Sequence, residues 1–164
     1  MQRIPQQHNA TLSVLDRLID DEPAMADRPW ISRAESVRLL KTSLKRDLEW
    51  LLNTRSVAAP PASLRELNRS VFVYGMPDFA AYTLASPANR AKLLRDLEAA
   101  IETFEPRLGA VNIVALEDER LSHAMRFRIE GLLLIHPAPE PVSFDTVLEL
   151  SSGEYQIKGE AHEG

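Results

Sequence analysis

Few of the residue types that carry out chemistry are grouped together in this 164-residue sequence. Cysteine is absent, which excludes disulfides, thiolate metal sites and cysteine nucleophiles. The four histidines, His8, His123, His136 and His162, have no histidine three or four residues away, so we expect no metal site and no cofactor. The six glycines form no phosphate-binding loop, dinucleotide fingerprint or nucleophile elbow.

Paired carboxylates are the remaining catalytic possibility, because glycoside hydrolases hold two of them across a sugar and keep one protonated. Glu98 and Glu102 are four residues apart on a predicted helix, and the run 117–119 is a charged turn, so both are ordinary solvated positions. Asp78 and Glu105 are further candidates. An aromatic content of 6% leaves few rings for stacking sugars. A cell-wall muramidase therefore remains only as the alternative hypothesis to a non-enzymatic protein.

The segment Phe104-Glu105-Pro106-Arg107-Leu108 is the most distinctive in the chain. Pro106 stiffens the backbone where a predicted helix passes into a predicted strand, so Glu105 and Arg107 are held on a nearly fixed platform. One interpretation is an ion pair within the domain at the helix exit. The other is a pre-organised arginine fork that captures a carboxylate or carbonyl groups of a partner. The residue types alone favour neither.

Two amphipathic helices are predicted to precede this segment. Ser32 and Glu35 have the spacing of a capping box, and leucines at steps of three and four then continue to a helix end near Asn53. Ser86-Pro87 indicates a second helix start, and Pro106 predicts that this helix ends near Phe104.

The connection between the two helices contains Pro60-Pro61 and so cannot be one continuous helix. Ser70–Tyr74 is a β-prone run, and the chain is expected to turn at Gly75-Met76-Pro77-Asp78. Asp78 is then expected to cap a short helix through Thr83.

From Gly109 onward apolar residues recur at every second position, which predicts strands over 111–116, 125–135, 142–150 and 155–157. Helices followed by consecutive strands indicate an α+β fold with a small antiparallel sheet of three to four strands. The last strand, Tyr155 to Ile157, is expected to leave an open edge, which is either protected or available to a strand of another chain.

We expect a single domain over residues 1–164, with 1–31 as a flexible or docking segment that contains a short amphipathic helix near 12–19. The net charge of −5 argues against a nucleic-acid partner. Neither a secretory signal nor an apolar run long enough to cross a membrane is present, so a cytoplasmic protein without direct membrane insertion is expected.

Charge is unevenly distributed along the chain. Seven basic residues outnumber four acidic ones between residues 35 and 69, whereas six acids stand against Lys158 alone from residue 140 onward. Either these are solvated faces of mixed sign, or the basic and acidic surfaces meet different partners in an assembly.

The order of several motifs resembles the TssE baseplate subunits of type VI secretion systems. These motifs are Tyr74-Gly75-Met76-Pro77-Asp78, Phe104-Glu105-Pro106-Arg107-Leu108, the strand Arg126–Gly131 and the closing Phe144-Asp145-Thr146-Val147. That family is related to a small wedge protein of contractile phage-tail baseplates and often carries a "lysozyme-like" label.

The resemblance implies a non-enzymatic structural subunit at the cytoplasmic face of the inner membrane. It implies other baseplate wedge subunits and contractile sheath subunits as partners, and a role in starting sheath assembly. The family's Glu-Pro-Arg motif falls on Glu105, Pro106 and Arg107, which favours the partner interface over the internal ion pair. The predicted interface residues are Glu105, Pro106, Arg107, Tyr74, Gly75, Pro77 and Asp78.

Overall fold

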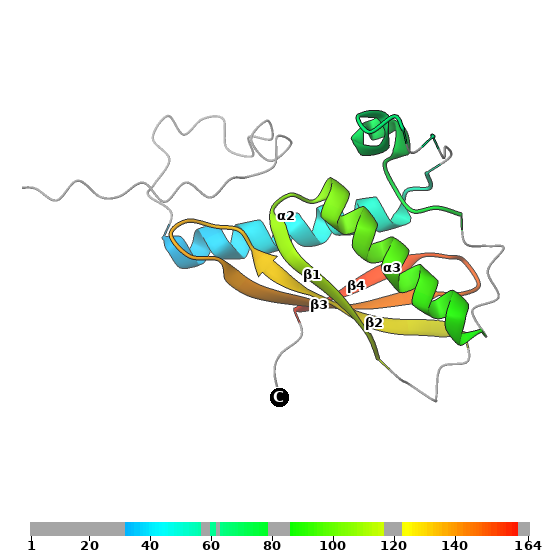
Figure 1. Cartoon of the computed structure of the whole chain (residues 1–164). Coiled ribbons are helices and arrows are strands. Elements are labelled where there is room, and N and C mark those ends of the chain that lie inside the picture. Colours follow the sequence, from blue (N-terminus) through cyan, green and yellow to red (C-terminus); the bar gives the residue numbers. More distant parts are fainter. Residues whose placement is uncertain (1–31, 57–59, 62, 79–85, 117–122, 161–164) are drawn as a thin grey trace, which may run out of the picture.

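The computed structural model describes residues 32–56, 60–61, 63–78, 86–116 and 123–160. Within them two long helices lie on one face of a four-stranded antiparallel sheet (Figure 1). The elements are α2 (Arg33–Asn53), η1 (Leu67–Arg69), η2 (Val71–Val73), α3 (Pro87–Phe104), β1 (Leu108–Leu116), β2 (Ala124–Leu133), β3 (Glu140–Glu149) and β4 (Tyr155–Glu160). The predicted α+β class, the bounds of both helices and the four strands are confirmed.

Helix α2 begins where the capping box predicts. The Oγ of Ser32 accepts a hydrogen bond from the amide of Glu35 at 3.2 Å, which satisfies one of the amides at the helix start. Its buried stripe is Val37, Leu40, Ser43, Leu44, Leu48, Leu51 and Leu52. The apolar side chains that recur every three or four residues in the sequence are therefore the ones that α2 turns toward the sheet.

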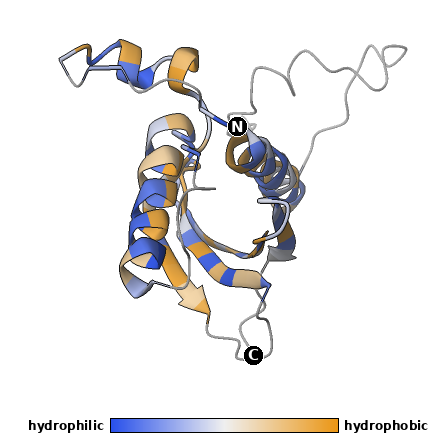
Figure 2. Ribbon diagram, turned by 90° about the vertical axis from the view of Figure 1, so that its right-hand side faces the viewer, coloured by the Kyte–Doolittle hydropathy of each residue, from blue (hydrophilic) through white to orange (hydrophobic). Residues whose placement is uncertain are grey.

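The sheet has the simple order β1-β2-β3-β4, with every neighbouring pair antiparallel. Alternate residues of β2 and β3 face the helices, so that Phe127 lies opposite Thr146 and Ile129 opposite Phe144. Helix α3 packs against β1 and α2 packs against β4. Viewed along the layer, the helices stand side by side over the curved sheet, with their hydrophobic faces turned inward (Figure 2).

Strand β4 is the last strand of the sheet, but side chains of α2 cover part of its outer backbone edge. Asn53 of α2 donates its side-chain amide to the carbonyl of Tyr155 at 3.0 Å and accepts from the amide of Tyr155 at 2.9 Å. The amide of Ile157 donates to Oε1 of Glu49 at 3.3 Å. Of the two alternatives for the edge at Tyr155 to Ile157, the protected one is observed, because two polar side chains of α2 bind both backbone groups of Tyr155 and the amide of Ile157.

Residues 63–73, called the arm below, project from the body beyond the end of α2 (Figure 1). The β-prone run Ser70–Tyr74 lies in 3-10 turn η2 and not in a strand, so that expectation is wrong. Ser70 explains the difference, because its Oγ accepts from the amide of Phe72 at 3.3 Å and its carbonyl accepts from Val73 at 3.2 Å. Local hydrogen bonds thus outweigh the β propensity of two valines and a phenylalanine.

The chain returns from the arm to the body at Gly75. Its φ is 109°, and a Cβ there would lie 2.5 Å from the carbonyl oxygen of Thr54. The next residue, Met76, is fully buried and forms a short parallel bridge with Arg55. Only glycine fits this approach, which fastens the arm to the end of α2.

Several expectations fall outside the described residues: the helix near 12–19 within segment 1–31, the short helix from Asp78 through Thr83, and the acidic run 117–119. Among the helices that the structure describes, none is long and apolar enough to cross a membrane.

Candidate functional site

Glu105, Pro106 and Arg107 form the junction between α3 and β1, as the sequence predicts. Glu105 is buried, with 6% of its surface exposed, whereas Pro106 is exposed. The Nε of Arg107 donates to Oε1 of Glu105 at 2.6 Å and its Nη2 donates to Oε2 at 2.5 Å. The arginine fork is therefore bound to a carboxylate of the same chain, which confirms the internal ion pair.

The same guanidinium also reaches across to α2. Its Nη2 donates to Oδ2 of Asp47 at 2.6 Å and its Nη1 donates to Oγ of Ser43 at 3.1 Å. Asp47 in turn accepts from Arg46 at 2.8 Å through Oδ1. Glu105, Arg107, Asp47 and Arg46 thus form one chain of alternating charges, called the ion-pair chain below. It connects the α3–β1 junction with the middle of α2.

Arg107 is the centre of this chain electrostatically as well as geometrically. The hydrogen bond to Glu105, together with the charges of Glu105 and Asp47, raises the pKa of Arg107 above its already high ordinary value, although burial opposes this. The side chain of Arg107 is only 14% exposed, so these interactions are weakly screened by water. Replacement by a neutral residue would leave two carboxylates facing each other.

The other four predicted interface residues, Tyr74, Gly75, Pro77 and Asp78, occupy different environments. Tyr74 is half-buried, and its ring meets that of Phe104 edge to face, with 5.3 Å between the centroids. Burial, and then the charges of Asp47 and Glu105, raise the pKa of Tyr74. Gly75 is buried against α2, whereas Pro77 and Asp78 are exposed. Among these four residues, Tyr74 is thus the one whose pKa is raised by the carboxylates of the ion-pair chain.

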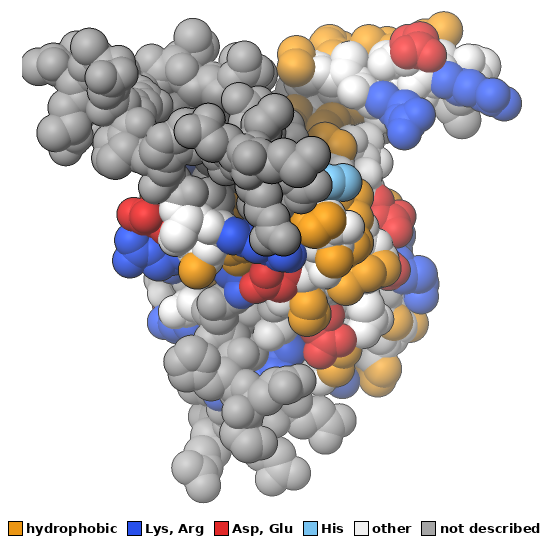
Figure 3. All heavy atoms as spheres, turned by 90° about the vertical axis from the view of Figure 1, so that its left-hand side faces the viewer, with side chains coloured by type: hydrophobic (Ala, Val, Ile, Leu, Met, Phe, Trp, Pro, Cys, Tyr) orange, Lys and Arg blue, Asp and Glu red, His pale blue; other side chains and the backbone are white. Residues whose placement is uncertain are grey.

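Exposed apolar side chains lie on the arm and at the end of α2. Val71 is 90% exposed, Phe72 55% and Trp50 50%. Arg46 places its guanidinium 5.0 Å from the centroid of the Trp50 ring, so the ion-pair chain ends at an exposed aromatic side chain. Figure 3 shows hydrophobic and charged side chains together on the projecting arm. Exposed Trp, Phe and Arg residues are typical anchors of protein interfaces.

Of the carboxylates considered for glycoside hydrolysis, the structure describes Asp78, Glu98, Glu102 and Glu105, whereas the run 117–119 lies outside the described residues. Both oxygens of Glu105 are held by Arg107, so neither is presented to a substrate. Glu102 is exposed on α3 and Asp78 is exposed beside the arm. Among the described residues no group of three His, Asp or Glu side chains is arranged to hold a metal ion.

Two members of this site, Ser43 and Asp47, were not found by reasoning from the sequence. Both lie in α2, about sixty residues before Arg107, and the spacing of four places them on one helix face. The available signal was their position beside the leucine stripe, because polar residues at the margin of a buried stripe need partners. The sequence does not indicate that this partner is Arg107.

Comparison with known proteins gives one family match. The family model described as "Baseplate wedge protein gp25" matches residues 38–138, well over half of the chain. This range includes both motifs of the candidate site and ends before β3. A solved chain from "The baseplate complex from the type VI secretion system" is 18% identical, with a TM-score of 0.48, and the match covers 67% of this chain and 94% of that chain. No curated protein matches the chain.

Proposed function

Since the chain belongs to the baseplate wedge protein gp25 family, we propose that it is a non-enzymatic structural subunit of a type VI secretion baseplate. The observation that carries the proposal is the family match over residues 38–138, which contains the whole candidate site. The ordered motifs from Tyr74 to Asp78 and from Phe104 to Leu108 support the type VI assignment within that family.

The other wedge subunits are proposed to bind the surface around the ion-pair chain. Arg107 itself is occupied by Glu105, Asp47 and Ser43, so its proposed role is to hold α2 and the α3–β1 junction in a fixed relation. Contact with partners then falls to the exposed neighbours, Pro106 and Trp50 among them. A surface fixed before binding loses little conformational entropy in the complex.

We propose that a strand of a sheath subunit pairs with the outer edge of β1, and not with that of β4. The amide of Glu149 in β3 donates to the carbonyl of Glu154, so the backbone groups of Glu149 point toward β4. Backbone groups of successive residues in a strand point alternately to the two neighbouring strands. When this alternation is followed through the strand registers from β3 to β2 and β1, the backbone groups of Ile113 and Ala115 point away from β2, toward the outer edge of the sheet. Within the described part of the chain no group occupies them, so they are available to a strand of a partner.

The proposed location is the baseplate at the cytoplasmic face of the inner membrane. The proposal requires no membrane span in this subunit, since its partners would supply the attachment.

The test is complementation of a strain that lacks the gene, with purification of the tagged protein under native conditions. Wild type is expected to bring down other wedge subunits and to restore fluorescent sheath foci. Pro106→Asp places a charge at the exposed tip of the junction and is expected to reduce recovery of wedge subunits about tenfold.

The matched control is Pro87→Asp, which makes the same change at the exposed first residue of α3, where Asp is well tolerated. Thermal unfolding of both variants verifies that they are folded. If Pro106→Asp is folded and assembles as well as Pro87→Asp, the proposed interface is wrong. If wild type recovers no wedge subunit at all, the baseplate role itself is wrong.

A further inference from the structure

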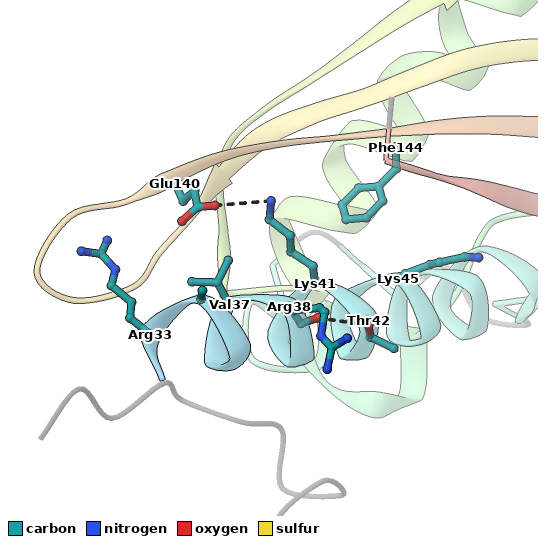
Figure 4. A pocket seen from close by; sticks show the side chains of 9 residues that line it. Arg33, Val37, Arg38, Lys41, Thr42, Lys45, Glu140 and Phe144 are labelled. Carbon is teal, nitrogen blue, oxygen red and sulfur yellow. Dashed lines mark hydrogen bonds and ion pairs between the residues drawn. The ribbon is translucent and has the colours of Figure 1, made fainter. Parts of the chain in front are cut away.

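A basic groove runs between the first half of α2 and the start of β3 (Figure 4), and none of the residues that line it belongs to the ion-pair chain. Its volume is about 690 Å³. The residues that line it are Arg33, Ala34, Val37, Arg38, Lys41, Thr42, Lys45, Glu140 and Phe144. Four of these nine are cationic and only Glu140 is anionic, so the groove is strongly positive in a chain whose net charge is −5.

The cations of the groove are only partly neutralised. Lys41 forms an ion pair with Glu140 at 3.4 Å, and Lys45 lies 3.9 Å from Glu49 on its own helix. Among the residues that the structure describes, no carboxylate is paired with Arg33 or Arg38. These two exposed arginines belong to the first turns of α2 and offer planar forks that suit carboxylates.

The base of the groove is apolar. Val37 is 8% exposed and Phe144 1%, and both belong to the packed layer between α2 and the sheet. Figure 4 shows Phe144 extending from β3 toward α2, and Lys41 reaching from α2 to Glu140 beside Val37. The groove therefore combines an apolar base with a cationic rim, as in sites that bind amphipathic segments.

We propose that the basic groove binds an acidic segment of a partner protein, whose carboxylates pair with Arg33 and Arg38 and whose apolar side chain lies over Val37. A polypeptide fits better than a nucleic acid, because a phosphate backbone has no apolar side chain to place against Val37. This inference does not depend on the wedge role, since it concerns a different surface, and its test uses no other baseplate subunit.

The probe is a synthetic 14-residue peptide with leucines at i and i+4 and glutamates on both sides, added to the full-length ¹⁵N-labelled protein. We expect saturable binding by fluorescence anisotropy, and amide shifts concentrated at Val37, Lys41 and Phe144. One comparison peptide replaces the glutamates by lysine and another replaces the leucines by alanine. Both are expected to bind about tenfold or more weakly.

The decisive variant is Arg33→Glu/Arg38→Glu, expected to weaken binding of the acidic peptide about tenfold or more. Its matched control is Arg90→Glu/Arg95→Glu, which makes the same charge change at exposed positions in the first half of α3. The control is expected to retain binding. Glu140→Gln is expected to strengthen binding severalfold, because it removes the carboxylate that competes for Lys41.

Several results would overturn the proposal. Equal weakening by the two charge reversals would mean that the peptide responds only to net charge. Tighter binding of a single-stranded DNA oligonucleotide to the same residues would make the occupant a nucleic acid. If Asp20→Asn/Asp21→Asn/Glu22→Gln raised peptide affinity tenfold, the occupant would be this chain's own acidic segment and not a partner.

Discussion

At the scale of single residues, Arg107 stabilises the fold by joining the α3–β1 junction to α2. Arg107→Ala leaves Glu105 and Asp47 without their common cation, so we expect the free energy of unfolding to fall by about 2–4 kcal/mol. Arg107→Lys keeps the charge but not the fork and should lose about half as much. Urea denaturation measures both, and a loss below about 0.5 kcal/mol for Arg107→Ala would contradict the stabilising role.

Because Arg107 stabilises the fold and also lies within the proposed interface, an assembly defect in Arg107→Ala has two explanations. Either the connection between α2 and the α3–β1 junction is loosened, or a contact with the partner is lost. Pro106 separates the two effects, because its side chain is exposed and belongs to the same turn.

Tyrosine ionisation gives a second residue-scale prediction. Burial and the charges of Asp47 and Glu105 raise the pKa of Tyr74, and burial raises the pKa of Tyr155. The folded-state pKa values thus exceed the unfolded value of about 10, so this contribution to stability is complete below about pH 10 and is lost as pH rises through the folded-state values.

Between about pH 9 and 12 we expect the free energy of unfolding to fall less steeply in Tyr74→Phe than in wild type. Urea denaturation at each pH gives the slopes, and absorbance at 295 nm follows the phenolates. Identical slopes in the two proteins would show that Tyr74 ionises normally.

At the scale of elements, Gly75 determines how the arm joins the body. Gly75→Ala adds a Cβ 2.5 Å from the Thr54 carbonyl oxygen at a φ of 109°, and we expect a loss of more than about 2 kcal/mol. Gly159→Ala is the matched control, because its φ is 132° and no atom of the residues that the structure describes lies within 4 Å of the added carbon. It should lose only about 1 kcal/mol, from backbone strain alone. Equal losses would mean that steric contact at Thr54 is unimportant.

The protected edge of β4 is tested by hydrogen exchange. Asn53→Ala removes both hydrogen bonds to the backbone of Tyr155, so its amide should exchange roughly tenfold faster than in wild type. Asn53→Asp keeps the acceptor for that amide and should remain protected. Unchanged exchange in Asn53→Ala would show that the side chain does not protect the edge.

The elements themselves could be predicted from the sequence because each depends on local signals. The capping box at Ser32, the proline at the first position of α3 and the two-residue period after Gly109 act within a few residues. The failures are contacts between distant elements. Asn53 covering Tyr155 and Asp47 binding Arg107 join residues 102 and 60 positions apart, which no local pattern encodes.

The candidate site shows the same division. The rigid Glu105-Pro106-Arg107 junction is a local property and was predicted, whereas its partner on α2 was not. The β-prone run at Ser70–Tyr74 failed for another reason, since Ser70 offers the backbone two local hydrogen bonds that a strand would forgo.

At the scale of the whole molecule, β1 is predicted to be the edge that a sheath strand joins. Ala115→Pro removes an outward-facing N–H that takes no part in the ladder with β2, so the fold should be retained. We expect strains with this variant to assemble wedge complexes but to form far fewer sheath foci. Ala115→Gly keeps the N–H and serves as the control at the same position. Normal sheath formation in Ala115→Pro would exclude this edge.

The two edges of the sheet differ in a way that gives the molecule a direction. At β4, Asn53 and Glu49 occupy the backbone at Tyr155 and Ile157 with side chains that are part of the same fold, whereas Ile113 and Ala115 of β1 face outward. If a sheath strand joins β1 as proposed, a ladder of strands that includes this protein would lengthen from the β1 side, because Asn53 and Glu49 cover part of the backbone of β4. Under that proposal the subunit would act as the closed end of a polymer, which admits a first strand at β1 and disfavours growth behind β4.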